Sequence, residues 1–311
     1  MKVLITGGAG YLGTELVDRL SRRDDVSEIV VYDNLSRPNY NLFIIQGPAP
    51  LGKVRFVRGD VLDSRKLRAV LRGVDVIYHL AARVTTPYSD ESAHLYEQVN
   101  HWGTAELVTA VEESEASRFI FTSSAAVYGF AEDAVNAETL PHPKTYYGAA
   151  KLRGEQQVAR LRDKISTFVV RCANVYGYSR SLRFDAVINR FVFCSRFGEP
   201  MVVQGSGRQV RSFVNILNAA ACLERLLDTT IPTGTYNLLD RTLSILSLID
   251  TVRAISPEAE VLFVNQHVEP RHLNMAFANS LGDLMRIVPG NFEAELERFS
   301  AQFATKKSAG W

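Results

Sequence analysis

The sequence has little cysteine and no long apolar run. Its three cysteines, Cys172, Cys194 and Cys222, are odd in number and widely spaced, which argues against a disulfide framework and fits buried thiols in a reducing cytosol. No stretch reaches the roughly 18 consecutive apolar residues of a membrane span, and Met1 leads directly into a strand pattern without the features of a signal peptide. These absences predict a cytoplasmic protein that does not enter a membrane.

Neither sign of charge predominates in the chain. The formal net charge is +1, and 22% of the residues are charged, with no basic block and no acidic tail. Nucleic acid and anionic membranes are therefore not expected as partners. The six histidines are dispersed, and the HExxH and CxxC spacings are absent, so no metal is predicted. Without internal repeats, 311 residues of alternating strand and helix patterns predict one or two α/β domains.

The first glycines of the chain have the spacing of a dinucleotide-binding turn. An apolar run over 2–6 is followed by Gly7, Gly10 and Gly13, and then by helical periodicity over 14–20. In a strand, turn and helix of this kind, the glycines let a pyrophosphate approach the backbone, and the helix N-terminus attracts its charge. We therefore predict a dinucleotide site at this turn.

The residue that ends the next predicted strand indicates which dinucleotide binds. The strand covers 29–32 and ends at Asp33, twenty residues after Gly13. A carboxylate there accepts hydrogen bonds from an adenosine ribose and repels a 2′-phosphate, which favours NAD over NADP. An ordinary turn role for Asp33 is the alternative, and the nearby Arg37 keeps NADP open.

Two further predicted strands end in residues that suit a cofactor. The strand over 54–57 ends at Gly59-Asp60, and the strand over 74–78 ends at His79-Leu80-Ala81-Ala82. Small residues after a strand end allow a cofactor to approach closely. His79 by itself is more often a packed core histidine than a functional one.

Tyr147 and Lys151 are the candidates for the chemistry. They are four residues apart, so in a helix they share one face. A phenol acts as a base at neutral pH when its pKa falls by about 3 units, or ~4 kcal/mol. An ammonium about 5 Å away, at an effective dielectric of ~20, supplies ~3 kcal/mol of this, and a nicotinamide cation could supply the rest. Tyr146 has Ala150 at the matching offset, so Tyr147 is the candidate base, although such pairs are also common on ordinary amphipathic helices.

Ser124 is the candidate partner of this tyrosine. The predicted strand over 119–123 continues into Ser124, and a hydroxyl at the carboxyl end of a parallel strand lies where such sheets bind ligands. Ser124 can therefore polarise a substrate oxygen near Tyr147. A cap or turn role is the ordinary reading of such a serine, and the tyrosine and lysine downstream reverse that preference.

The alternation of elements predicts the architecture. After a strand over 167–171 the strict strand and helix alternation loosens, and the remaining pattern offers too little repeated structure for another sheet of six strands. We predict an α/β fold in which a Rossmann-type doubly wound parallel sheet is joined to a smaller C-terminal α/β substrate lobe. The predicted division places 1–177 in the dinucleotide-binding domain, with 211–238 returning to it, and 178–210 and 239–311 in the lobe.

Taken in order, these motifs resemble those of the extended short-chain dehydrogenase/reductases and, within them, the NAD-dependent nucleotide-sugar epimerase/dehydratase family. The resemblance runs from residue 4 to about 240. It is carried by the glycine turn 6–13, Asp33-Asn34-Leu35, Gly59-Asp60-Val61, His79-Leu80-Ala81-Ala82, Asn100 with Gly103-Thr104, the run 123–129, Tyr147 with Lys151, and 171–177.

The resemblance implies a role for each matching residue. Tyr147, Lys151 and Ser124 would be the catalytic trio, in which Tyr147 removes a proton from a sugar hydroxyl while hydride passes to NAD. The implied cofactor residues are Gly7, Gly10, Tyr11, Leu12, Gly13, Asp33, Asn34, Asp60, Val61, Leu80, Ala81, Ala82, Asn100, Tyr147 and Lys151. The implied substrate residues are Thr85, Thr86, Ser124, Asn174, Arg211 and Arg271. The helices around 92–113 and 145–162 would pair with their mates in a homodimer.

Three departures from the family pattern bear on function. Dehydratases of the family usually carry an acidic pair after the catalytic hydroxyl, whereas this chain has Ala125-Ala126, which argues against 4,6-dehydration. Where relatives usually read R-D-F-V-x-V-x-D, the segment from Arg211 to Asn218 has lost both acids, so the nucleotide is less secure. The loop over 178–183 contains Arg180 and Arg183 and is also unusual.

The leading hypothesis is therefore an epimerase acting on a UDP- or dTDP-sugar, most simply at C4, that keeps its NAD through the cycle. A ketosugar reductase that consumes NAD(P)H and a dehydratase are the enzymatic alternatives. A non-catalytic NAD-binding regulatory protein is a third reading.

Overall fold

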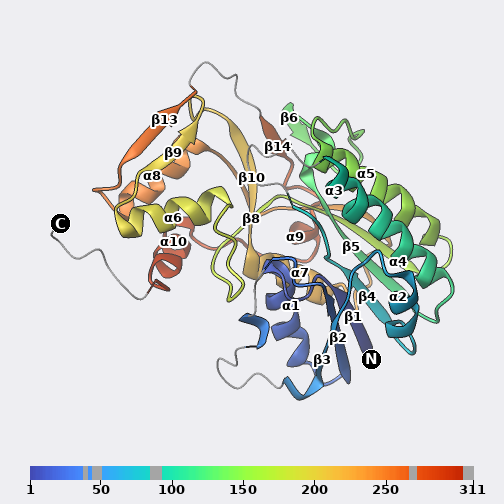
Figure 1. Cartoon of the computed structure of the whole chain (residues 1–311). Coiled ribbons are helices and arrows are strands. Elements are labelled where there is room, and N and C mark those ends of the chain that lie inside the picture. Colours follow the sequence, from blue (N-terminus) through green and yellow to red (C-terminus); the bar gives the residue numbers. More distant parts are fainter. Residues whose placement is uncertain (38–40, 44–50, 85–92, 266–271, 304–311) are drawn as a thin grey trace.

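A computed structural model describes residues 1–37, 41–43, 51–84, 93–265 and 272–303. In these residues a large parallel sheet lies between two layers of helices, and a smaller lobe stands over one edge of it (Figure 1). The predicted doubly wound α/β sheet is thereby confirmed.

The large sheet has seven strands. They are β1 (Lys2–Thr6), β2 (Glu28–Asp33), β3 (Val54–Arg58), β4 (Val76–His79), β5 (Arg118–Ser124), β7 (Ser166–Cys172) and β11 (Gly234–Leu238). Their order is β11-β7-β5-β4-β1-β2-β3, and every pair is parallel. The chain reverses its direction of growth between β1 and β4, and at such a switch point the carboxyl ends of the strands leave a crevice for ligands.

Helices cover both faces of this sheet. Because strand side chains alternate, Val3 and Ile5 contribute to one core, while Leu4 contributes to the other. The first core is closed by α1 (Tyr11–Ser21), α7 (Ile216–Arg225) and α9 (Leu281–Leu284). The second is closed by α2 (Ser64–Val70), α4 (Gly103–Glu112) and α5 (Tyr146–Val158), with α3 (Ala93–Tyr96) beside α5.

A π-helical turn, η3 (Glu97–Trp102), joins α3 to α4 beside the sheet edge. Asn100 in this turn is fully buried, and its side-chain amide both accepts from Arg83 N and donates to Arg83 O, each at 2.8 Å. Gly154 of α5 lies against the same turn, since a Cβ there would be 2.8 Å from Asn100 O. The turn therefore binds the loop after β4 and packs closely against α5.

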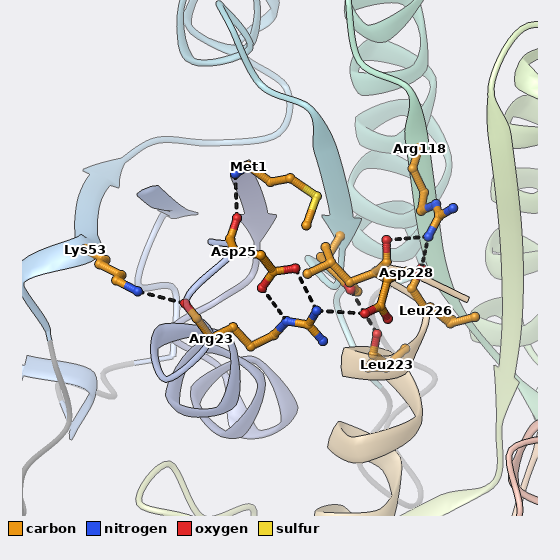
Figure 2. Close-up of polar contacts among 10 residues, drawn as sticks. Met1, Arg23, Asp25, Lys53, Arg118, Leu223, Leu226 and Asp228 are labelled. Carbon is orange, nitrogen blue, oxygen red and sulfur yellow. Dashed lines mark hydrogen bonds and ion pairs between the residues drawn. The ribbon is translucent and has the colours of Figure 1, made fainter. Parts of the chain in front are cut away.

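The amino ends of the strands are tied together on the opposite edge (Figure 2). Arg23, just after α1, bonds to Asp25 at 2.7 Å and to Asp228 at 2.8 Å, while Arg118 at the start of β5 donates to Leu226 O at 2.6 Å. The exposed ion pairs contribute little individually. Together, these contacts join the segment between α1 and β2, and the start of β5, to the end of α7. This edge of the sheet is separate from the ligand crevice.

The smaller lobe contains two further sheets. The strands β6 (Ala131–Val135), β8 (Asn174–Tyr176), β10 (Val210–Asn215), β12 (Arg241–Ser244) and β14 (Leu273–Met275) form one, and β9 (Met201–Gln204) pairs with β13 (Val261–Val264) in the other. The helices α6 (Val187–Phe197), α8 (Ile245–Ile255) and α10 (Phe292–Ser300) pack with β9 around a third core. The short helical turns are η1 (Asn41–Phe43), η2 (Leu51–Lys53), η4 (Ala125–Tyr128) and η5 (Ala159–Leu161).

The segment 211–238, expected to return to the large sheet, is divided between the two parts. β11 joins the large sheet and α7 packs on α1, whereas β10 pairs with β8, β12 and β14 in the second sheet. The sequence did not predict β6, β8, β9, β12 or β14, which are only three to five residues long. The division into domains stays a prediction.

We expect Gly154→Ala to destabilise the protein by about 1–2 kcal/mol, even though alanine favours helices by up to ~1 kcal/mol, because its methyl group would force α5 away from the π-helical turn. The measurement is the urea midpoint at constant m value. Gly52→Ala is the matched control, since a Cβ at Gly52 meets nothing within 4 Å. Equal midpoints for the two variants would show that α5 is not seated closely on the turn.

Candidate active site

A cleft of about 1970 Å³ opens at the carboxyl ends of the large sheet, between that sheet and the lobe. Pockets for one small molecule usually measure roughly 300–1,000 Å³. The cleft therefore has room for a dinucleotide and a second ligand together. Its lining comes from the ends of β1 to β5 and β7 on one side, and from α6, β9 and β10 on the other.

The glycine turn forms the floor of this cleft. Gly7 has a φ of +73°, and a Cβ there would lie 2.5 Å from Ala81 N, so a side chain would separate the turn from the loop after β4. Gly10 precedes α1 without a side chain to cap it, and Tyr11, Leu12 and Gly13 of the first turn line the cleft. A helix N-terminus of this kind is suited to a pyrophosphate.

Asp33 is held rigidly at the end of β2. Its two carboxylate oxygens accept from Ala9 N at 3.1 Å and from Leu35 N at 2.8 Å, and burial raises the pKa of the carboxyl. Each oxygen keeps further acceptor capacity for a ribose hydroxyl. The nearby Arg37 lies 3.9 Å from Asp185, so its guanidinium has an acidic neighbour of its own.

His79 is a packed core residue, which is the more common role of such a histidine. Its ring is fully buried and is hydrogen-bonded to Thr6 Oγ1 at 2.7 Å and to Thr104 Oγ1 at 2.9 Å. Burial lowers the pKa of His79 to about 3, so the ring is neutral at physiological pH. The residues after it, Leu80 to Ala82, line the cleft.

Ser124, Tyr147 and Lys151 meet on one wall of the cleft. The Thr145 side chain accepts from Gly148 N at 3.1 Å and begins α5, which places Tyr147 in the first turn and Lys151 one turn later. The Lys151 ammonium donates to Thr122 O at 2.8 Å. Burial raises the pKa of Tyr147, and a hydrogen bond with Ser124 offsets part of that rise.

The charge balance at Tyr147 differs from the expectation. Burial raises the pKa of Tyr147 overall, and the cation that offsets this is Arg183 rather than Lys151. The prediction that Lys151 lowers the pKa of Tyr147 is therefore wrong when only the groups of the protein are considered. The reason is that the lysine is itself buried and its ammonium is directed at Thr122 O. Burial also lowers the pKa of Lys151 from 10.5 to about 8.

Sequence reasoning missed a strap, residues 177–185, that lies along the glycine turn. Tyr11 OH donates to Gly177 O at 2.5 Å, and Ser181 Oγ lies 2.7 Å from Thr14 Oγ1. Asn189 of α6 donates to Tyr11 OH at 3.1 Å and extends these contacts into the lobe. In the sequence, Arg180 and Arg183 marked this stretch as unusual. The serines and the asparagine that make its contacts lie among apolar residues and do not stand out in the sequence.

Cations outnumber acids in the part of the cleft that the structure describes. The basic lining residues are Arg37, Arg83, Lys151, Arg180, Arg183, Arg190 and Arg211, and the acidic ones are Asp33, Asp60 and Asp185. A concave site with this balance attracts anionic ligands.

Most residues named from the sequence lie in this one cleft. The lining includes Gly7, Gly10, Tyr11, Leu12, Gly13, Asp33, Asn34, Asp60, Val61, Leu80, Ala81, Ala82, Ser124, Tyr147, Lys151, Asn174 and Arg211. Asn100 is not part of it, since its amide is bonded to the Arg83 backbone. Thr85, Thr86 and Arg271 lie outside the described residues.

This geometry agrees with the comparisons with known proteins. The family model described as the NAD dependent epimerase/dehydratase family matches residues 3–238, and the chain belongs to this family. The predicted family is thereby confirmed, together with the cofactor that its description names.

Individual relatives have different activities. The chain is 30% identical over 235 residues to a dTDP-glucose 4,6-dehydratase of Streptomyces niveus, covering 73% of this chain and 69% of that protein. It is 26% identical over 285 residues to the dTDP-D-glucose 4,6-dehydratase of Bos taurus, covering 88% and 79%. The crystal structure of a UDP-glucuronic acid 4-epimerase from Bacillus cereus, in complex with UDP-glucuronic acid and NAD, matches with a TM-score of 0.85 at 25% identity, covering 97% and 98%. Membership of the family therefore does not decide between epimerisation and dehydration.

The described part of the chain lacks two features. No described helix is long and apolar enough to cross a membrane. In the same part of the chain, no three His, Cys, Asp or Glu side chains gather in a way that could hold a metal ion.

We expect Lys151→Met to stabilise the protein at pH 7 by roughly 3 kcal/mol, because the folded state holds this ammonium with a pKa of about 8 instead of 10.5. Below pH 8 both states keep the proton, and the full cost of burial applies. As the pH rises from 8 to 10.5 the folded state loses the proton first, so the wild type becomes relatively more stable and the difference vanishes above 10.5. Urea unfolding across this range checks the expectation, with Lys66→Met as the control for loss of an exposed lysine. A difference that does not change with pH would contradict it.

Proposed function

We propose that the protein is a nucleotide-sugar 4-epimerase that oxidises its substrate transiently and reduces it again with the same NAD. The proposal is supported by the trio on one wall of the cleft, by the dinucleotide turn beside it and by the family. The cleft volume suits a bound dinucleotide together with a nucleotide sugar.

The observation that carries the proposal is the absence of acids beside Ser124. The next two residues are Ala125 and Ala126, which enter the short helical turn η4. Of the described acids that line the cleft, Asp33 and Asp60 belong to the ends of β2 and β3, and Asp185 is bonded to Arg183 at 3.0 Å. Elimination of water requires groups that remove one proton and donate another, whereas epimerisation requires one proton acceptor and a polarising donor.

Each residue of the trio then has a defined task. In its ionised form, which the hydrogen bond from Ser124 and the charge of Arg183 favour, Tyr147 accepts the proton of the C4 hydroxyl, and Ser124 donates to the same oxygen as it becomes a ketone. Lys151, whose ammonium donates to Thr122 O, lines the same wall of the cleft and would orient the ribose of the cofactor. Bound NAD supplies the acceptor of the C4 hydride. Return of the hydride would require the ketosugar to turn in the cleft and present its other face, and Tyr147 would then return the proton, so no net oxidation would result.

The lobe supplies the groups for the nucleotide diphosphate. Arg211 on β10 lines the cleft, and guanidinium groups bind phosphate oxygens in a fork geometry. Asn174 on β8 also lines it and donates to Ser212 O at 3.0 Å, which holds β8 and β10 together. These contacts fit the roles that the family resemblance implies for Arg211 and Asn174.

A 4,6-dehydratase is the second candidate, and the curated relatives favour it. It would release a 4-keto-6-deoxy sugar, whereas a reductase would consume NAD(P)H. Incubation with UDP- and dTDP-hexoses, followed by NMR at C4 and by absorbance at 340 nm, separates the three. We expect inverted C4 signals without net cofactor turnover. A keto-sugar product, or cofactor consumption in step with product, would overturn the proposal.

Tyr147→Phe is expected to lower kcat by about 10²–10⁴-fold, because general base catalysis typically contributes that much. The matched control is Tyr146→Phe, which removes a hydroxyl from the adjacent tyrosine, a residue that is 54% exposed. We expect the control to keep its activity. Equal rates for both variants would remove Tyr147 from the mechanism.

We also propose a homodimer through the face that η3, α4 and α5 share. Trp102 on this face is 57% exposed and stacks on His101 with ring centroids 4.7 Å apart. An aromatic residue this exposed is a common interface anchor. Light scattering at micromolar concentration is expected to show a dimer, and Trp102→Glu a monomer. A monomeric wild type would contradict the assignment.

A further inference from the structure

The short turn η4, which follows Ser124, and the first turn of α5 approach each other closely through their backbones. Gly148 comes directly after Tyr147, and a Cβ on it would overlap the carbonyl oxygen of Ala126 and lie 3.0 Å from the carbonyl carbon. The same atom would lie 3.1 Å from Pro143 Cβ. Because carbon atoms in contact are roughly 3.5–4.0 Å apart, a side chain at position 148 would require a movement of about 0.5–1 Å.

The backbone of Ala126 contacts the catalytic serine as well as the helix. Its N–H donates to Ser124 Oγ at 3.2 Å, and its carbonyl oxygen faces Gly148. The Ser124 hydroxyl is in turn hydrogen-bonded to Tyr147. Ala126 therefore connects the serine hydroxyl to the helical turn that carries the phenol.

The turn η4 has little freedom to move away from the helix. Val127 and Tyr128 within it are buried. Tyr128 OH donates to Asn237 Oδ1 on β11 at 2.6 Å and accepts from Arg171 Nη1 on β7 at 3.0 Å. A side chain at position 148 would therefore displace α5 and leave η4 in place.

The later turns of α5 are anchored independently of this contact. Lys151 Nζ donates to the backbone of β5 at 2.8 Å. One turn further on, the buried Glu155 carboxylate accepts from Arg171 Nη2 at 2.7 Å, from Arg171 Nε at 3.0 Å and from Ser123 Oγ at 2.5 Å. Because these contacts prevent the helix from sliding as a unit, a displacement would be concentrated in its first turn.

Thr145 holds this first turn against η4. Its hydroxyl accepts from Gly148 N at 3.1 Å, so the residue that approaches Ala126 is also the residue that the cap binds. An N-cap hydroxyl stabilises the first helical turn by satisfying one of its free N–H groups. The cap and the missing side chain thus act on the same turn, which carries Tyr147.

We propose that Gly148 is a positioning residue. The contact between its backbone and η4 sets the separation between the hydroxyl groups of Tyr147 and Ser124, and the Thr145 cap maintains that contact. The inference rests on the proposed function, because the reacting oxygen of the sugar must lie within hydrogen-bond reach of both hydroxyls. A misplacement of about 1 Å can lower the rate of a reaction by roughly 10²-fold.

The test is Gly148→Ala, measured with saturating NAD on the sugar that the wild type converts. We expect kcat to fall by about 10²-fold while KM and the affinity for NAD are unchanged, because Lys151 and the glycine turn keep their places. The matched control is Gly154→Ala, which adds the same methyl group to the same helix two turns from Tyr147. We expect the control to keep its kcat, and an equal loss of kcat in the two variants would overturn the proposal.

Crystal structures of the wild type and of both variants with NAD provide a readout without activity. We expect the distance between Tyr147 Oη and Ser124 Oγ to be about 0.5–1 Å longer in Gly148→Ala than in the wild type, and unchanged in Gly154→Ala. If this distance increases but the wild type epimerises no sugar, the positioning role holds and the proposed function fails. If the distance is the same in all three proteins, the positioning role is overturned.

The cap keeps the proposal testable if Gly148→Ala does not fold. Thr145→Ala adds no volume and is expected to lower kcat about tenfold at unchanged KM, whereas Thr145→Ser keeps the hydroxyl and is expected to retain the wild-type kcat. The control for the loss of a hydroxyl cap is Ser244→Ala at the start of α8, where Ser244 Oγ accepts from Ser247 N at 3.0 Å. A Thr145→Ala variant as active as Ser244→Ala would contradict the proposal.

Discussion

The close approach of two loops at the switch point of the sheet is the constraint on which the site depends. Gly7 leaves β1 with a left-handed backbone, and the absence of its side chain lets Ala81 come within contact distance. This brings the turn before α1 beside the loop after β4, and Asn100 holds that loop from below through the Arg83 backbone. The floor of the cleft is thus set by contacts of the backbone at Gly7, Ala81 and Arg83, and not by the side chains at the rim of the cleft.

The second organising feature is charge that is kept away from water. Lys151, Glu155 and Arg171 are all buried, and each has hydrogen-bond partners that compensate for part of its lost hydration. The energy for these arrangements comes from the two apolar cores on either face of the sheet. A site of this kind has low local polarity, in which fixed charges act strongly on a reacting proton.

The sequence predicted the large sheet because its strands are apolar runs with glycines or acids at their ends, as at Gly7 and Asp33. It predicted the sites of Tyr147 and Lys151 from helical spacing, but not the electrostatics, because burial cannot be seen in a spacing. The short strands of the lobe were missed because three to five residues carry no clear period. The Ser212 hydroxyl lies 2.7 Å from Thr242 Oγ1 and also accepts from Met275 N, a long-range contact that local patterns do not reveal.

The strap over the glycine turn has a consequence for how ligands come and go. Because Tyr11 is hydrogen-bonded to both Gly177 and Asn189, the glycine turn and helix α6 of the lobe are held together. A lobe that swung open at this point would have to break both of these part-buried hydrogen bonds. Opening of the cleft would therefore be least hindered away from the strap, toward β9 and β10, while the glycine turn and α6 stay joined.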